Sequence, residues 1–284
     1  MVKQLEEDKF SSESITRELA GPALESGVHL LFDLHDRTFQ ALPEFLAENG
    51  YKDISDSQNG IFQKAFGTDL ACYEYLALDT KLQGQFQDSM ALHSPTSGDW
   101  LSALPGHLVE ETPALEHDPV LFVDIGGGMG HQSIRLRERY PNAIGRVILQ
   151  DMQVTIDRIS KPMPHGVEAM VHGLFDPQPV KGAKLYYLRN VLHGLPDRDG
   201  VTVLENIRTA MSPESRLVID DIVVPGQGAS REICQLDFIM MASIAGKKRT
   251  KGEWQSLLDA AGYKIVDICT YDWVAHDSLI IASL

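Results

Sequence analysis

The stretch VLFVDIGGGMG, residues 120–130, decides the fold. Its first five residues predict a buried strand, glycines follow at 126, 127, 128 and 130, and a helix is predicted over 131–140. Glycines let the backbone turn sharply and let a ligand approach without meeting a Cβ. The start of the following helix presents free N–H groups. This order predicts a ligand-binding loop, and a plain tight turn is the alternative.

Strands and helices alternate on the C-terminal side of this loop. Short apolar runs at 146–151, 185–188 and 216–220 predict three more strands, and a helix is predicted over 197–211. Apolar strands separated by helices are typical of a parallel, doubly wound sheet. The runs 263–268 and 278–282 predict a closing pair of strands. The predicted fold class is therefore α/β.

The N-terminal region has a different pattern. Ser and Thr caps precede an apolar spacing at 11–19, an amphipathic helix is predicted from residue 28, and apolar residues recur at helical intervals over 70–92. A stretch punctuated by prolines, 104–119, follows. We therefore predict a mostly helical domain over 1–104 and an α/β domain over 105–284.

Composition excludes several classes of protein. Apolar residues make up 43% and charged residues 23%, which is ordinary for a globular protein. Three widely spaced cysteines suggest neither a disulfide framework nor a metal site, and we expect reduced thiols in the cytoplasm. No signal peptide or membrane span is evident. The net charge of −15 disfavours nucleic acid and membrane surfaces as partners.

A carboxylate accompanies the glycine loop. Asp151 ends the next strand, 27 residues after Asp124, and can accept both hydroxyls of a ribose. Alternatively, Asp151 caps the following helix. An NAD site would show the same acid, but the glycine spacing is GxGxG, and His131 stands where the last glycine of GxGxxG would fall. An NAD-dependent dehydrogenase is therefore a distant alternative.

Five segments taken together resemble one family. They read VDIGGGMG at 123–130, LQDM at 149–152, PQPVKGAK at 177–184, YYLRNVLHGLPD at 186–197 and GKKRTKGEW at 246–254. These segments resemble plant caffeate-type and fungal secondary-metabolite O-methyltransferases, and their sequences are most similar to the fungal branch. The resemblance extends from about residue 10 to the C-terminus. The resemblance implies a Rossmann-like methyltransferase domain with S-adenosylmethionine at the glycine loop. It also implies a winged-helix N-terminal domain that makes a homodimer, and the chain is expected to begin inside that winged helix.

The resemblance also implies roles for single residues. His193 matches the catalytic base, and Asp221 matches an acid that orients it. The expected cofactor contacts are Asp124, Gly126, Gly128, Asp151, Met152, Leu174, Phe175 and Arg189. The expected contacts with a small-molecule acceptor are Asn190, Met240, Met241 and Ile244, on or near a segment that also carries Asp237; the two methionines fit an ordinary helix core equally well.

His193 also has support from its position. It stands five residues past Leu188, at the carboxyl edge where open α/β sheets bind ligands. A neutral imidazole suits proton removal near pH 7. A structural histidine is the alternative reading.

Three positions depart from the family pattern. Lys248 replaces the acid of a Gly-Lys-Glu-Arg-Thr motif, and Gly194 and Gly173 stand where many relatives have Asp. A cation beside the imidazole would lower its pKa, unless Lys248 points to solvent.

We therefore predict O-methylation of a hydroxyl on a small aromatic or polyketide-type secondary metabolite. One alternative is a relative that binds S-adenosylmethionine but catalyses a dehydration or a pericyclic reaction, with Arg189 and Asn190 donating to a polarised carbonyl. The other is an inactive scaffold.

Overall fold

The computed structural model describes residues 2–91, 99–110, 119–159 and 162–284. These residues form two compact units, one of residues 2–53 with 58–91 and one of residues 54–57 with the described residues from 99 onward. Each unit has its own core.

The first unit is mostly helical. It contains a hairpin of β1 (Val2–Glu6) and β2 (Lys9–Ser12) and the helices α1 (Ser14–Leu19), α2 (Pro22–Leu30), α3 (Asp36–Glu48), α4 (Ile61–Phe66), α5 (Cys72–Ala77) and α6 (Thr80–Ala91). A π-helical turn, Leu31–His35, joins α2 to α3. Helix α2 packs against α6, and α3 packs against α4. The hairpin was not predicted because its strands are almost wholly exposed and therefore have no apolar face.

Two predicted helix boundaries were wrong. The helix expected from residue 28 begins at Pro22, where the fixed φ of proline suits a first helical position. The helix expected over 70–92 is broken between α5 and α6. There the Asp79 carboxylate accepts hydrogen bonds from the backbone N–H groups of Lys81 and Leu82, 2.7 and 3.3 Å away, and so caps α6. Leu92 lies outside the described residues.

The second unit is built on a mixed, mainly parallel sheet. Its strands are β3 (Val120–Ile125), β4 (Arg146–Asp151), β5 (Glu168–Val171), β6 (Leu185–Arg189), β7 (Arg216–Val224), β9 (Lys264–Thr270) and β10 (Asp277–Ser283), in the order β5-β4-β3-β6-β7-β10-β9. The first five strands of this order are parallel, and β10 is antiparallel to β7 and β9. The short β8 (Arg249–Thr250) pairs with the end of β7. The predicted strands are confirmed, whereas β5, which is short and partly exposed, was missed.

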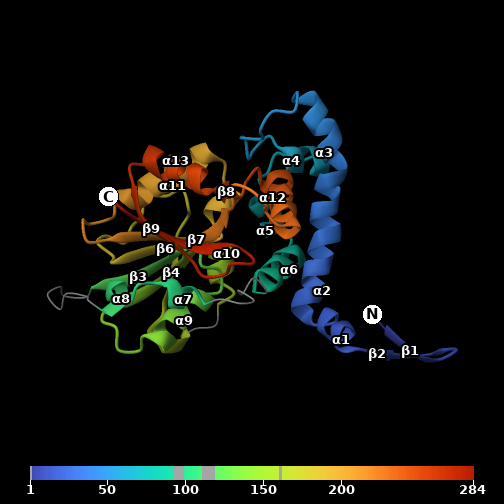
Figure 1. Ribbon diagram of the computed structural model, residues 1–284, viewed down its shortest axis with the longest axis horizontal. Coiled ribbons are helices and arrows are strands. Elements are labelled where there is room, and N and C mark those ends of the chain that lie inside the picture. The colour runs from blue at the N-terminus through green and yellow to red at the C-terminus, as the bar shows by residue number, and fades with distance from the viewer. Residues whose placement is uncertain (1, 92–98, 111–118, 160–161) are drawn as a thin grey trace. The chain divides into compact units, whose positions relative to one another are not determined.

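Helices cover both faces of this sheet (Figure 1). Along β6, Leu185 and Tyr187 pack into one core, and Tyr186 and Leu188 pack into the other. The first core includes residues of α7 (Trp100–Ala103) and α9 (His131–Arg139), and the second includes residues of α11 (Asp197–Arg208) and α13 (Lys251–Ala260). The shorter helices are α8 (His107–Glu110) and α10 (Gln153–Ile156), and α12 (Arg231–Ile244) precedes β8. This arrangement is Rossmann-like, as predicted.

The predicted domain boundary at residue 104 stays a prediction. Trp100 and Leu104 pack into the core of the second unit beside Phe122. Residues 111–118 of the proline-punctuated stretch lie outside the described residues.

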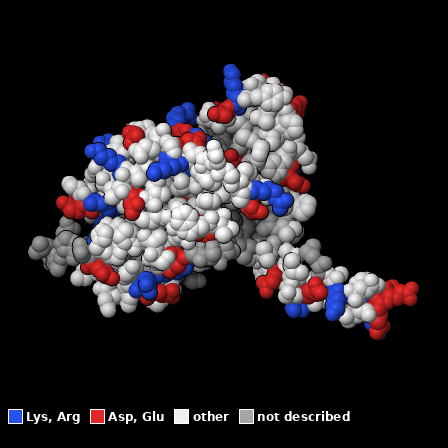
Figure 2. Space-filling model, viewed as in Figure 1, with Lys and Arg blue, Asp and Glu red and all other residues white. Residues whose placement is uncertain are grey.

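Charged side chains are dispersed over the face of the molecule that Figure 2 draws. On the face drawn in Figure 2, acidic and basic groups are interspersed, so the negative net charge does not form one broad patch there. In the described parts of the chain, none of the helices has both the length and the apolar character that a bilayer crossing requires.

We expect Trp254→Ala to destabilise the second unit by about 3–5 kcal/mol, because it removes a fully buried ring whose indole N–H donates to the Ile222 carbonyl. Urea unfolding followed by circular dichroism measures the change. The matched control is Trp273→Ala, which removes a ring that is 76% exposed and should change stability by no more than about 0.5 kcal/mol. Equal losses in the two variants would contradict this assignment of the core.

Candidate active site

The site lies where three parallel strands end. Because β3, β4 and β6 run in the same direction, the segments that follow them meet at one edge of the sheet. The strand order reverses between β3 and β6, and such a switch point is where open α/β sheets bind ligands. The segments also touch, because a Cβ on Gly126 would lie 3.0 Å from Val191 Cγ2.

The glycine loop after β3 needs its glycines. Gly126 and Gly128 have φ values of +69° and +60°, in the left-handed region that favours glycine. Packing excludes a larger residue at position 127, since an added Cβ would lie 2.4 Å from Asp124 Cγ and 2.5 Å from Leu149 Cδ1. The loop is therefore a close-packed cradle in which backbone lies directly over an acidic side chain.

Asp124 is fully buried beneath this loop. Its Oδ2 accepts a hydrogen bond from the Ser133 hydroxyl at 2.8 Å, whereas its Oδ1 has no hydrogen-bond partner among the described residues. Burial raises the pKa of Asp124 to about 7, and the nearby charge of Asp151 adds to this effect. A buried acceptor without a partner is rare in proteins, and an ordered water is one group that can supply the donor.

Asp151 stands at the end of β4 and holds the loop. Its Oδ2 accepts a hydrogen bond from Gly128 N at 2.9 Å, and its Oδ1 accepts one from Met152 N at 2.8 Å. Helix α10 has no side-chain cap, so Asp151 does not act as its cap. Each carboxylate oxygen has a second lone pair and can accept a ribose hydroxyl in addition. The glycine loop and the Asp151 carboxylate together fit an adenosine-containing ligand.

The other predicted cofactor residues differ in how far they are exposed to solvent. Met152 is 43% and Phe175 is 52% exposed at the sheet edge, and Leu174 is half-buried. Arg189 donates from Nη1 to Asp220 Oδ2 at 2.5 Å and to the Tyr271 hydroxyl at 3.4 Å. Although burial alone would lower the pKa of Arg189, the adjacent Asp220 charge raises it, so the guanidinium stays charged. It therefore neutralises a buried acid.

Sequence reasoning missed an acid near Gly173. A Cβ on Gly173 would lie 2.4 Å from Asp176 Oδ2, so the carboxylate of Asp176 lies against the position at which many relatives carry Asp. A search for acids within one turn of that position could have found it.

His193 lies in the turn η3 (Leu192–Gly194) that follows β6. Its Nδ1 lies 2.9 and 3.1 Å from the two carboxylate oxygens of Asp221, and its side chain is 11% exposed. Burial lowers the pKa of His193 below its ordinary value; Asp221 opposes this effect, and the charge of Lys248 adds to it. Although burial alone would raise the pKa of Asp221, His193 and Lys248 lower it, so the carboxylate stays ionised.

Lys248 does not point to solvent, which was one of the two expectations. Its side chain is 4% exposed, and its Nζ lies 2.8 Å from His193 Nδ1 and 3.1 Å from Asp221 Oδ1. The three side chains therefore form a buried imidazole–carboxylate–ammonium cluster, which we call the His193 cluster.

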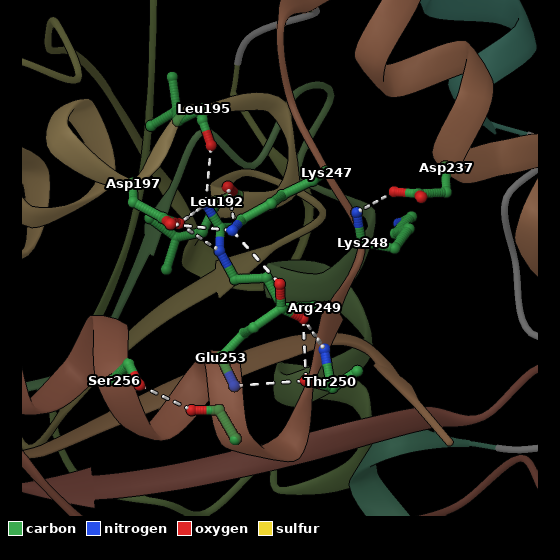
Figure 3. A network of polar contacts seen from close by, with 11 residues as sticks. Leu192, Leu195, Asp197, Asp237, Lys247, Lys248, Arg249, Thr250, Glu253 and Ser256 are labelled. Carbon is green, nitrogen blue, oxygen red and sulfur yellow. Dashed lines mark hydrogen bonds and ion pairs between the residues drawn. The ribbon is translucent and has the colours of Figure 1, made fainter. Parts of the chain in front are cut away.

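Arg249 fixes the turn that carries His193, as Figure 3 shows. Its guanidinium is fully buried, and it donates to the carbonyls of Leu192 and Leu195 at 2.7 and 2.8 Å and to Asp197 Oδ1 at 2.9–3.0 Å. Sequence reasoning gave Arg249 no role. The available signal was its place in the segment 246–254, one of the five that carry the family resemblance.

Predicted acceptor residues lie on two elements. Asn190 follows β6 with a φ of +53°, a conformation that Asn tolerates better than most residues, and its N–H donates to the Asp220 carbonyl. The segment of α12 that bears Met240, Met241 and Ile244 is half-buried, and α12 packs against η3. The Asp237 carboxylate of the same helix accepts a hydrogen bond from Lys248 N at 2.7 Å.

Comparison with known proteins agrees with this geometry. Residues 48–264 match the O-methyltransferase domain family. The chain is 57% identical over 265 residues to O-methyltransferase dpfgI of Gibberella zeae, covering 93% of this chain and 70% of that one. It is 39% identical over 273 residues to demethylsterigmatocystin 6-O-methyltransferase of Aspergillus flavus, covering 96% and 69%.

A solved structure of LepI in complex with S-adenosylmethionine matches with a TM-score of 0.92 at 40% identity, covering all of this chain and 73% of LepI. LepI is from Aspergillus flavus. Another solved structure, described as a pericyclic reaction enzyme, also matches with a TM-score of 0.92 at 40% identity.

The fold and the sheet-edge site therefore define a class I methyltransferase that uses S-adenosylmethionine. Within that class, the chain belongs to the O-methyltransferase family.

We expect Gly127→Ala to weaken binding of S-adenosylmethionine at least about tenfold, because the new methyl group must displace Asp124 or Leu149 beneath the loop. Isothermal titration calorimetry measures the affinity. The matched control is Gly252→Ala, where an added Cβ meets nothing within 4 Å and should leave affinity unchanged. Unchanged binding by Gly127→Ala would remove the glycine loop from the cofactor site.

Proposed function

We propose that this enzyme methylates a hydroxyl of a small aromatic or polyketide-type metabolite and that His193 is the general base. The observation that carries the proposal is the His193–Asp221 contact at the edge of the sheet where the glycine loop ends. A relative at 39% identity is named for 6-O-methylation of demethylsterigmatocystin, which supports an acceptor of this kind.

The cofactor supplies a methyl group on a positively charged sulfur, which is already a good leaving group. The protein must therefore bring the acceptor oxygen into line and remove its proton. Alignment in such reactions is worth up to about 7–11 kcal/mol, and a positioned base adds roughly 10²–10⁴-fold.

The geometry of His193 supports the second task. Because Nδ1 faces Asp221, Nε2 lies on the opposite side of the ring and is the nitrogen that would meet an acceptor. When Nδ1 carries the proton, it donates to the carboxylate, and Nε2 then has a free lone pair. Asp221 is a positioning residue in this scheme, because it holds the ring and its tautomer.

A second candidate function is a reaction without methyl transfer. Two observations favour it. One is the likeness to a solved structure described as a pericyclic reaction enzyme, and the other is the ammonium of Lys248 beside Nδ1, which suits an imidazole that donates from Nε2. Product mass distinguishes the candidates, since an unchanged or dehydrated product with the cofactor unconsumed supports the second. The predicted homodimer and cytoplasmic location remain predictions.

We expect His193→Asn to lower the kcat of methyl transfer by about 10²–10⁴-fold, because the variant keeps a polar, hydrogen-bonding side chain but lacks a base. Transfer of labelled methyl from S-adenosylmethionine to a panel of phenols and enols gives the rate, and calorimetry shows whether cofactor affinity is retained. The matched control is His165→Asn, at an exposed residue with φ +56° that Asn accepts. A variant at position 193 that keeps full kcat would rule out the general base.

A further inference from the structure

The His193 cluster contains a fixed positive charge. The Lys248 side chain is buried, and its backbone N–H donates to Asp237 Oδ1 at 2.7 Å. Just before it, Gly246 packs against the turn so closely that a Cβ would lie 2.1 Å from the His193 carbonyl oxygen, and Lys247 N donates to that same oxygen at 2.9 Å. The backbone therefore holds Lys248 against the imidazole from two directions.

Proton uptake by this imidazole changes the charge of the cluster unfavourably. With His193 neutral, the Asp221 carboxylate and the Lys248 ammonium balance each other. When His193 takes a proton, a second cation stands 2.8 Å from the Lys248 ammonium in a site with little water. An acid at position 248, as in the Gly-Lys-Glu-Arg-Thr motif, would instead make the cluster more neutral on protonation. The lysine therefore makes His193 a weak base.

Lys248 also influences which tautomer the neutral His193 ring adopts. An ammonium group donates three hydrogen bonds and accepts none. Nδ1 can accept a hydrogen bond from Lys248 only when Nδ1 carries no proton, and the proton of the neutral ring is then on Nε2. Nδ1 can donate to Asp221 only when it carries the proton, and the Lys248 ammonium then faces an N–H group. Both the base form of the ring and the imidazolium are therefore disfavoured by Lys248.

The charged groups on the elements that pack against this turn all affect the proton affinity of His193. They are Asp221 on β7, Lys248 next to β8, Arg249 on β8, Asp237 on α12 and, acting through Lys248 and Asp221, Asp277 on β10. Only Asp221 and Lys248 lie within hydrogen-bond distance of the His193 ring among the described contacts. The lysine is therefore the nearest charge that can weaken the base.

We propose that Lys248 restricts the acceptor to acidic hydroxyls, meaning enols conjugated to a carbonyl or phenols with electron-withdrawing groups. This inference rests on the proposed function. The acceptor oxygen gives an electron pair to the methyl carbon, and the pair of the broken carbon–sulfur bond stays on sulfur. The hydroxyl proton goes to His193 Nε2, or to solvent beforehand. In the second case Nε2–H donates to the acceptor oxyanion.

The first test follows the His193 ring by NMR in protein labelled at histidine, with the signal assigned by its loss in His193→Asn. We expect a titration midpoint below the ordinary value of about 6.5 in the wild type. In Lys248→Gln and Lys248→Met it should rise by about one pH unit, a tenfold change in proton affinity, and in Lys248→Glu by more. The control Lys251→Gln, at an exposed residue of α13, should leave it unchanged. Equal midpoints in the wild type and Lys248→Gln overturn the proposal.

The second test measures kcat/KM for acceptors of similar size and graded acidity, from plain phenol, whose pKa is near the tyrosine value of about 10, to nitro-substituted phenols and enols that are ionised at pH 7. The wild type should methylate the acidic members, and Lys248→Glu should gain at least tenfold on plain phenol. A wild type that prefers plain phenol overturns the acceptor class and leaves methyl transfer standing. Failure on every acceptor with cofactor bound contradicts the proposed function itself, whereas the NMR titration still decides the role of Lys248.

Discussion

A fully buried guanidinium holds the functional edge of this enzyme together. Arg249 lies inside the second unit, where an unpaired charge would be very unfavourable. Its donors are taken up by two backbone carbonyls of the turn after β6 and by Asp197 at the start of α11. Removing either side would leave polar groups buried without partners. The turn, the helix that follows it and the strand β8 therefore depend on one another, and His193 is fixed as a consequence.

The segment that carries Arg249 also supplies the charge beside the imidazole of His193. Lys248 immediately precedes Arg249, so the backbone that anchors the guanidinium also sets the place of the ammonium. We therefore expect a substitution at position 248 to change the proton affinity of His193 while Arg249 keeps its own contacts with the turn.

Much of the α/β unit could be predicted because β3, β4, β6 and β10 are short, largely apolar runs with little exposure. The strand β5 could not, because it is an edge strand of four residues with little burial. The π-helical turn and the break at Asp79 were also hidden, since periodicity continues across them. At the site, the positions of Asp151 and His193 followed from strand ends. The contact of Lys248 with His193 and those of Arg249 with the turn did not, because they join segments more than fifty residues apart in sequence.

Four acids at this edge differ in what neutralises them. Asp220 is matched by Arg189, Asp221 by Lys248, and Asp151 by backbone N–H groups. Asp124 has the Ser133 hydroxyl, and burial raises its pKa to about 7, so near neutral pH its carboxyl group is partly protonated. A cationic sulfonium ligand near this edge would lower that pKa, since a nearby opposite charge favours the ionised form. Linkage then requires that ionisation of Asp124 strengthen binding of the cation by the same free energy.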